Sequence, residues 1–253
     1  KAQDNNHGTS EGAALYVGGT WLLLADPEDL QARKWCDAGR AYLHERVARL
    51  IEQDGTFSQY SVTYHRLMMD TLSLVELWRK RLDMPKFSKS YVCSLRAATK
   101  WLLIFIDTAS GDTPNLGAND GAHILNFSGA PVRDFRPSAE LSCQLFLQKT
   151  AFSSVESKVI REMFDLYANH QFVWPNTEKL VNGGYGIIRS HSAFCVLNVP
   201  NFRFRPSQAD MLHLDFWLKG ENLLKDAGSF SYNTQPKWLT YFSGVEGHNT
   251  VQF

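Results

Sequence analysis

The sequence predicts a multidomain α+β protein in which a helical array precedes an antiparallel β domain. Through the first two thirds, apolar residues recur every three or four positions, which is typical of amphipathic helices. After about residue 173 the pattern changes to short apolar or alternating runs rich in β-forming residues and interrupted by glycines. We therefore expect one domain over residues 1–172 and a second over residues 173–253.

Four helices follow from this periodicity. The pattern predicts the first over residues 29–53, where Asp54-Gly55 ends it as a turn, and the second over residues 61–81. A third is expected over residues 89–107, and a fourth over residues 138–169 with a break near Ser153. Antiparallel helices joined by loops fit a layered α/α array.

The strands are expected where β-forming residues cluster between glycines. The clearest segments are residues 185–189, 194–199, 213–218 and 249–253. The chain begins with Lys1 instead of Met and stops at Phe253 inside the last of these strands. We therefore expect that both ends are cut and that the two domains are incomplete.

Composition excludes some functions. The 26 basic and 26 acidic side chains give a formal net charge of zero, which argues against a protein that coats nucleic acid. A local basic groove for an acidic polymer remains compatible with this balance. The longest apolar run, residues 101–106, is too short to span a membrane. Four cysteines without a CxxC pair predict buried thiols instead of a disulfide framework or a zinc finger.

Asn6 and His7 form the first candidate site. They stand just before a predicted helix, so an amide and an imidazole would lie together at the N-terminal end of that helix. Capping of that helix by Asn or Ser is the simpler alternative.

A second candidate site surrounds Tyr60, Tyr64 and Arg66 at the start of the helix predicted from residue 61. Tyr60 and Tyr64 would share a face if that helix began early. A tyrosine near cations can act as a proton acceptor. The alternative is a half-buried tyrosine that packs at a helix end.

The third candidate is a metal site. His213 and Asp215 alternate along a predicted strand and therefore point to the same side, and Asp226 and His248 follow in later segments. Two imidazoles and a carboxylate from separate segments suit a closed metal site. A hydrogen-bonded polar cluster is the alternative.

Several of these motifs together resemble the heparinase II/III-like polysaccharide lyases. Residues 205–217, 220–228 and 248–251, with Tyr232-Asn233, resemble the β-sandwich signature of that family. Asn5-Asn6-His7 and the segment ending at Arg66 resemble its two catalytic stretches, and residues 117–121 resemble a family loop. The resemblance implies the end of an α/α toroid followed by the start of an antiparallel β-sandwich.

The resemblance also implies a reaction. Family members cleave uronic-acid-containing polysaccharides by β-elimination, in which an enzyme removes the C5 proton beside the sugar carboxylate. Asn6 and His7 would neutralise that carboxylate, and Tyr64 would act as acid, base or both. Substrate-binding roles are expected for Tyr60, Arg66 and Asn119.

By the same resemblance, His213, Asp226 and His248 would hold a structural metal, usually zinc in relatives. Many relatives carry a further histidine where this chain has Met211, and His191 is a conceivable replacement. The resemblance further implies a periplasmic or secreted location and an acidic polysaccharide as the partner.

Two other functions stay open at this point. Met211 favours a protein that binds acidic polysaccharide or assists its assembly without catalysis. A hydrolase on an α/α toroid would need two carboxylates flanking the bond, for which Asp54 and Asp120 are the conceivable candidates.

Overall fold

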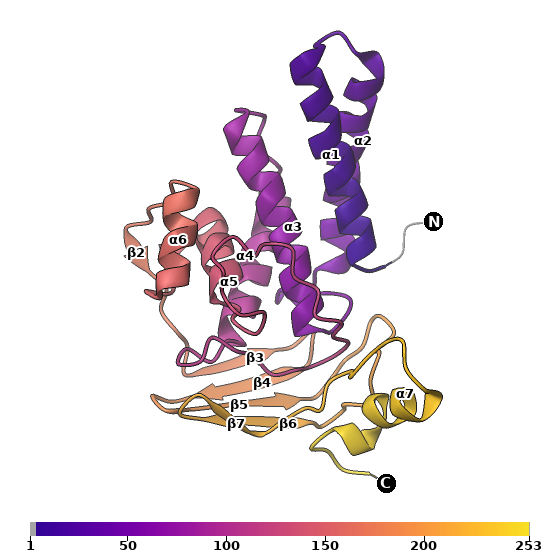
Figure 1. Ribbon diagram of the computed structural model, residues 1–253, viewed down its shortest axis with the longest axis vertical. Coiled ribbons are helices and arrows are strands. Elements are labelled where there is room, and N and C mark those ends of the chain that lie inside the picture. The colour runs from indigo at the N-terminus through magenta and orange to yellow at the C-terminus, as the bar shows by residue number, and fades with distance from the viewer. Residues whose placement is uncertain (1–3, 253) are drawn as a thin grey trace.

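The computed structural model describes residues 4–252 and places a group of helices on one side of an antiparallel sheet (Figure 1). The long helices are α1 (Asn6–Ala25), α2 (Leu30–Leu50), α3 (Val62–Arg81) and α4 (Lys89–Ile104). Each begins at a polar residue whose side chain accepts a hydrogen bond from the backbone of the first turn; these caps are Asn5, Asp29, Ser61 and Ser88. The predicted starts at 29, 61 and 89 therefore agree with the structure within one residue.

Helices α1 and α2 form an antiparallel hairpin. The apolar periodicity of the sequence did not predict the bounds of α1. Its second half runs through Trp21-Leu22-Leu23-Leu24, where continuous apolar residues hide any amphipathic spacing. Trp21 and Leu24 are exposed, whereas small residues lie at the contact with α2. A Cβ on Gly39 would lie 2.3 Å from the Tyr16 backbone nitrogen, so the close approach of α1 and α2 requires glycine there.

The helix predicted over residues 138–169 is interrupted near Ser153 as expected, but it ends at Met163, and the interruption contains a short strand. The chain forms α5 (Arg136–Ser142), one π-helical turn η1 (Cys143–Leu147), strand β1 (Lys149–Thr150), α6 (Val155–Met163) and strand β2 (His170–Gln171). The buried Glu140 carboxylate explains the interruption, because it accepts hydrogen bonds from the N–H groups of Ala151 and Phe152 at 2.9 Å each. Ser154 then caps α6.

A five-stranded sheet follows. Its strands β3 (Thr177–Leu180), β4 (Tyr185–Arg189), β5 (Ala193–Asn198), β6 (Leu214–Leu218) and β7 (Glu221–Leu224) lie in sequence order, and all pairs are antiparallel. The predicted order of a helical part before an antiparallel sheet is therefore confirmed. Residues 4–252 supply one sheet of the expected sandwich. Short helices α7 (Pro236–Ser243) and η2 (Val245–Gly247) complete the described chain.

The predicted strand over residues 249–253 is wrong within the described part, since residues 249–252 adopt no strand. The Asn249 N–H donates to the imidazole of His213 at 3.0 Å, and its side-chain amide donates to the Leu214 and Lys225 carbonyls. These bonds tie Asn249 to β6 and to the segment after β7.

One face of the sheet packs on the helices. Tyr185, Phe194 and Trp217 are buried on this face. Trp101 of α4 and Phe105, which directly follows α4, meet Tyr185 edge-on at 5.8 and 5.2 Å between ring centroids. Ile188 and Leu197 point away from the helices and are exposed. Within residues 4–252, no helix is long and apolar enough to cross a membrane.

Candidate active site and metal centre

Tyr64 lies in the first turn of α3, and its hydroxyl joins two distant segments. The side chain of Ser61 caps this turn by accepting from the Tyr64 N–H at 3.1 Å. The Tyr64 hydroxyl donates to Asp120 Oδ2 at 2.9 Å, and the Tyr232 hydroxyl donates to the Tyr64 oxygen at 3.1 Å. A carboxylate and two phenols thus form one hydrogen-bonded chain.

The loop that carries Asp120 is held by its own hydrogen bonds. Asp120 Oδ1 accepts from the Ala122 N–H at 2.9 Å, which leaves Oδ2 for Tyr64. The Asn119 side chain accepts from the Gly121 N–H at 2.8 Å and donates to Asn115 at 2.6 Å. The Asn119 N–H donates to Ser229 Oγ at 2.9 Å. These bonds fix the loop against the segment that presents Tyr232.

A polar cavity of about 580 Å³ lies beside Asp120 and Tyr232, the two hydrogen-bond partners of the Tyr64 hydroxyl. Asp120 and Tyr232 line it, together with the amide side chains of Asn115, Asn119 and Asn233. Amide, phenol and carboxylate groups suit the hydroxyl-rich surface of a sugar, since they both donate and accept hydrogen bonds. Asn119 is therefore placed where a substrate-binding role, still a prediction, would require it.

Both phenols are held in their neutral form. Burial raises the pKa of Tyr64, and its hydrogen bonds with Tyr232 and Asp120 raise it further. Burial also raises the pKa of Tyr232. A free tyrosinate at position 64 is therefore strongly disfavoured at neutral pH.

Asn6 and His7 form the first turn of α1, close to the start of α3. The Asn6 N–H donates to the Gln59 side chain at 2.7 Å, and the Ser58 hydroxyl donates to the Asp4 carbonyl at 3.0 Å. Asn5 caps this helix, while Asn6 is buried and His7 is exposed. Among residues 4–252, no hydrogen bond joins the side chain of Asn6 or His7 to Tyr64, and their catalytic roles stay predictions.

Tyr60 and Arg66 are engaged with the protein itself. The Tyr60 hydroxyl accepts from the N–H groups of Arg203 and Phe204 at 2.8 and 3.0 Å. Helix α3 begins only at Val62, so Tyr60 and Tyr64 do not share a helical face. The Arg66 guanidinium is buried, donates to the carbonyls of Val132 and Ala122, and lies 4.1 Å from the Phe135 ring centroid.

These contacts support structural roles for Tyr60 and Arg66. Burial lowers the pKa of Arg66 to about 10, which still leaves it charged at neutral pH. Its guanidinium holds two carbonyls of the loop that follows Asp120. Arg66 thereby supports the loop instead of facing the cavity.

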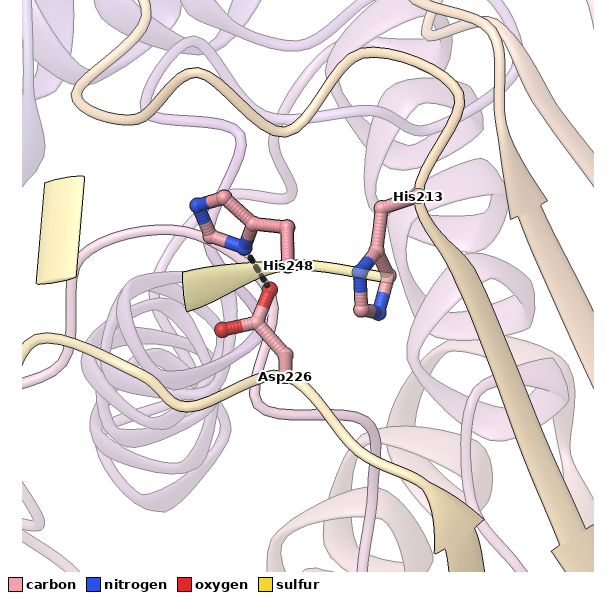
Figure 2. Close-up of side chains that lie close together, drawn as sticks. All are labelled: His213, Asp226 and His248. Atoms are coloured by element: carbon pink, nitrogen blue, oxygen red, sulfur yellow. Dashed lines mark hydrogen bonds and ion pairs between the residues drawn. The ribbon is translucent and has the colours of Figure 1, made fainter. Parts of the chain in front are cut away.

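The predicted metal ligands converge. Figure 2 shows His213, Asp226 and His248 pointing toward one another from three segments, and one ligand atom of each lies within 4.8 Å of the others. Asp226 Oδ2 and His248 Nδ1 are 2.9 Å apart, and Asp226 Oδ1 accepts from the Gly228 N–H at 2.7 Å. Burial lowers the pKa of His248, but the hydrogen bond and charge of Asp226 outweigh it and raise the pKa overall.

The donor set fits a metal ion such as zinc. The Nε2 atoms of His213 and His248 are buried without a hydrogen-bond partner, and unpaired buried polar atoms are costly. His213 Nδ1 accepts from the Asn249 N–H, so a neutral His213 carries its ring proton on Nε2, and Nδ1 would have to leave Asn249 before it could bind a metal. Asp215 of β6 lies 3.5 Å from the Nε2 of His213, which directly precedes that strand, and accepts from the Trp217 indole.

Neither Met211, which stands where relatives carry a further histidine, nor His191, its conceivable replacement, lines the cavity beside Asp120 and Tyr232. Met211 is exposed. His191 lies in the turn between β4 and β5 and lines a different cavity with Arg136 and Trp174. No hydrogen bond of the described residues brings His191 to Tyr64.

Asp54 and Asp120 do not form a pair around one cavity. Asp54 Oδ2 accepts from the N–H groups of Asn182 and Gly183, and its Oδ1 accepts from Thr56. Asp120 instead serves Tyr64. A hydrolase with these two carboxylates flanking a bond therefore has no support in the structure.

Sequence reasoning missed the partners of Tyr64. Asp120 entered as a conceivable hydrolase acid and as part of a family-like loop, and Tyr232 entered as part of a family-like motif, but neither was predicted to contact Tyr64. Their positions lie 56 and 168 residues from Tyr64 along the chain, so no local spacing links them. The available signal was the presence of both residues in motifs that resemble family loops.

Comparison with known proteins identifies the family to which this fold belongs. The chain belongs to the heparinase II/III-like family: residues 1–124 match the model described as the heparinase II/III N-terminus, and residues 175–253 match the heparinase II/III-like C-terminal model. No curated protein sequence matches the chain.

Solved structures show the same fold. The chain is similar to heparinase III with a TM-score of 0.69 and 17% identity, over 97% of this chain and 38% of that one. It is also similar to the heparan sulfate lyase HepC from Pedobacter heparinus, with a TM-score of 0.63 and 19% identity, over 92% of this chain and 34% of that one. This chain therefore spans about a third of the length of these structures.

Proposed function

We propose that the protein is a lyase that cleaves a uronic-acid-containing polysaccharide by β-elimination, with Tyr64 as acid and base. The observation that carries the proposal is the Tyr64 hydroxyl, held between Asp120 and Tyr232 beside a polar cavity. Membership in the heparinase II/III-like family supports it.

The reaction requires that the sugar carboxylate be neutralised before the C5 proton leaves. Asn6 and His7 are the groups proposed for this task, since hydrogen bonds to a developing dianion stabilise the transition state. The first turn of α1 is tied to Gln59, five residues before Tyr64. A phenol then receives the proton, and general acid–base catalysis of this kind contributes roughly 10²–10⁴-fold.

The heparan sulfate class is the first substrate to test, because one solved structure with this fold is named a heparan sulfate lyase. Alginate and bacterial exopolysaccharides are the next candidates. A periplasmic or secreted enzyme would meet such polymers, and we propose that location.

His213, Asp226 and His248 would hold a structural metal, with zinc proposed. The ion would join β6, the segment after β7 and the segment after η2. The approach of one ligand atom from each of the three residues to within 4.8 Å of the others supports this assignment.

The substitution Tyr64→Phe in the full-length protein tests the proposal. It removes one hydroxyl and should abolish the ultraviolet absorbance of the unsaturated uronate product, a loss of about 100-fold or more. Tyr167→Phe, which alters an exposed tyrosine, serves as the matched control and should keep full activity. Unchanged turnover in Tyr64→Phe would remove Tyr64 from the mechanism.

A non-catalytic polysaccharide-binding protein is the second candidate, and Met211 is the observation that favours it. Tight binding of acidic glycans by the wild-type protein, without any double-bond product, would support this alternative.

A further inference from the structure

The proposed reaction requires that the phenolic proton of Tyr64 have an acceptor. A phenol can serve as a base either as a tyrosinate or as a neutral group that loses its own proton while it accepts another. Burial and the adjacent carboxylate disfavour the tyrosinate. The neutral route needs a nearby acceptor, and Asp120 Oδ2 lies 2.9 Å away.

Resting on the function proposed above, we propose that Asp120 holds the Tyr64 proton between C5 deprotonation and protonation of the leaving oxygen, and that Tyr232 orients the Tyr64 oxygen. Asp120 acts through Tyr64 and is thus a positioning residue that also stores a proton. Tyr232 occupies one acceptor position on the Tyr64 oxygen, while the phenolic proton points at Asp120. In the proposed reaction, the proton from the sugar would be taken up at the remaining lone pair of this oxygen.

The step balances without any external reagent. The C5–H bond breaks, its proton goes to Tyr64 Oη, and the phenolic proton passes to Asp120 Oδ2. The electron pair left at C5 forms the C4–C5 double bond, and the C4–O bond breaks with its pair on the glycosidic oxygen. Tyr64 then protonates that oxygen and recovers its own proton from Asp120, so that every side chain returns to its initial state.

The geometry around Asp120 suits this role. Its Oδ1 is fixed by the Ala122 N–H, which aims Oδ2 at Tyr64, and the residue is exposed along the polar cavity. A carboxylate with a purely structural role would need only its hydrogen bonds. A proton store must also change its protonation during turnover, and this difference can be measured.

The test uses the full-length protein and an acidic polysaccharide that the wild-type protein cleaves. Asp120→Asn keeps an oxygen for the Ala122 N–H and another polar group near Tyr64, but it cannot take up a proton. We expect kcat to fall about 100-fold, with KM changed by less than about threefold. The acid limb of the pH–rate profile should disappear in this variant.

Asp120→Ala gives a second readout, because added formate can replace the missing carboxylate. Activity should recover with increasing formate in Asp120→Ala and stay constant with formate in the wild-type protein. Tyr232→Phe removes the orienting hydroxyl and should lower kcat about tenfold while the acid limb remains, a smaller effect than loss of a general acid–base group.

Asp26→Asn is the matched control, since Asp26 Oδ1 also accepts from a backbone N–H two residues further on, at 3.0 Å, in an exposed turn. Full kcat, an unchanged pH profile and no response to formate in the Asp120 variants would overturn the proposal. If Tyr64→Phe were inactive in the same experiment, the proposed function would still stand. A wild-type protein that makes no unsaturated product from any acidic polysaccharide would instead overturn the proposed function itself.

Discussion

At the residue scale, the Tyr64 hydroxyl both donates a hydrogen bond and accepts one within the protein. Its oxygen carries a proton directed at a carboxylate and receives a second hydrogen bond from another phenol. An elimination in which one side chain both takes and returns a proton needs such a group, because donor and acceptor must occupy the same place in succession. Because burial disfavours the tyrosinate form of Tyr64, the proposed reaction requires the Asp120 carboxylate as the acceptor of the phenolic proton.

The sequence was sufficient to place Tyr64 but not its partners. Ser61 caps the helix and sets Tyr64 in its first turn, and this follows from local capping preferences. The contact with Tyr232 depends on how the segment after β7 folds back onto α3, which is a tertiary effect. The partners of Arg66 could likewise not be predicted from local sequence. Its charge suggested a sugar acid as partner, whereas its guanidinium donates to two backbone carbonyls.

The three candidate metal ligands converge, as the order of the family-like motifs led us to expect, while the metal itself stays a prediction. Added zinc should raise the melting temperature of the protein after treatment with a chelator, because an ion that binds only the folded state stabilises it by about 2.7 kcal/mol at 100 times Kd. Thermal unfolding with and without zinc provides the measurement.

The variant His213→Ala should lose this zinc-dependent increase, since it removes one of the three ligands. His170→Ala, which alters an exposed histidine on β2, is the control and should retain it. If zinc leaves the melting temperature of the wild-type protein unchanged, the three residues form a hydrogen-bonded cluster without a metal.

At the scale of elements, the hairpin between β3 and β4 docks on the turn between α2 and α3. Asp54 accepts from the N–H groups of Asn182 and Gly183 at 2.7 and 2.9 Å. A Cβ on Gly183 would lie 2.2 Å from Thr56 Oγ1, so glycine is required for this approach. The sequence indicated both turns from their Asp-Gly and Gly-Gly residues, but not that they touch.

We expect Asp54→Ala to lower the free energy of unfolding by about 2–3 kcal/mol, because it leaves backbone N–H groups without their charged acceptor. Urea unfolding measures this loss, and Asp37→Ala, at an exposed position on α2, should change stability by less than about 0.5 kcal/mol. Loss of product formation with full stability would instead point to a catalytic Asp54.

The elements that were predicted well are those whose signals are local. Strand β4 has the predicted bounds because β-branched residues lie between a glycine turn and a polar turn. The helix predicted over residues 138–169 is interrupted over a longer segment than the expected break near Ser153, because buried Glu140 accepts from the N–H groups of Ala151 and Phe152. That interaction has no periodic signature in the sequence.

At the scale of the whole molecule, the site exists only where the helical part meets the sheet and its loops. Tyr64 and Asp120 come from the helical part, whereas Tyr232 and the metal ligands follow the sheet strands. Several polar contacts join the two parts beside the apolar contact, among them those of Asp54, Tyr60 and Arg189, whose guanidinium donates to the carbonyls of Ile104 and Ile106. The geometry of the site therefore depends on this junction.

Tyr60 provides the test of that dependence. Its backbone has φ 49°, in the left-handed region, which costs about 1–3 kcal/mol for a residue with a side chain. The surrounding contacts offset this strain: the hydroxyl accepts from Arg203 and Phe204, and the ring packs on Phe202 at 4.9 Å between centroids. The sequence suggested substrate binding for Tyr60, whereas these contacts favour a role in the junction.

We therefore expect Tyr60→Phe to lower the free energy of unfolding by about 1–3 kcal/mol, since two backbone N–H groups lose their acceptor. The KM for the polysaccharide should change by less than about twofold, because the hydroxyl makes no contact with the cavity beside Tyr64. Urea unfolding and steady-state kinetics on the same preparation separate the two roles. A large rise in KM without loss of stability would return Tyr60 to the substrate-binding site and would contradict the junction role.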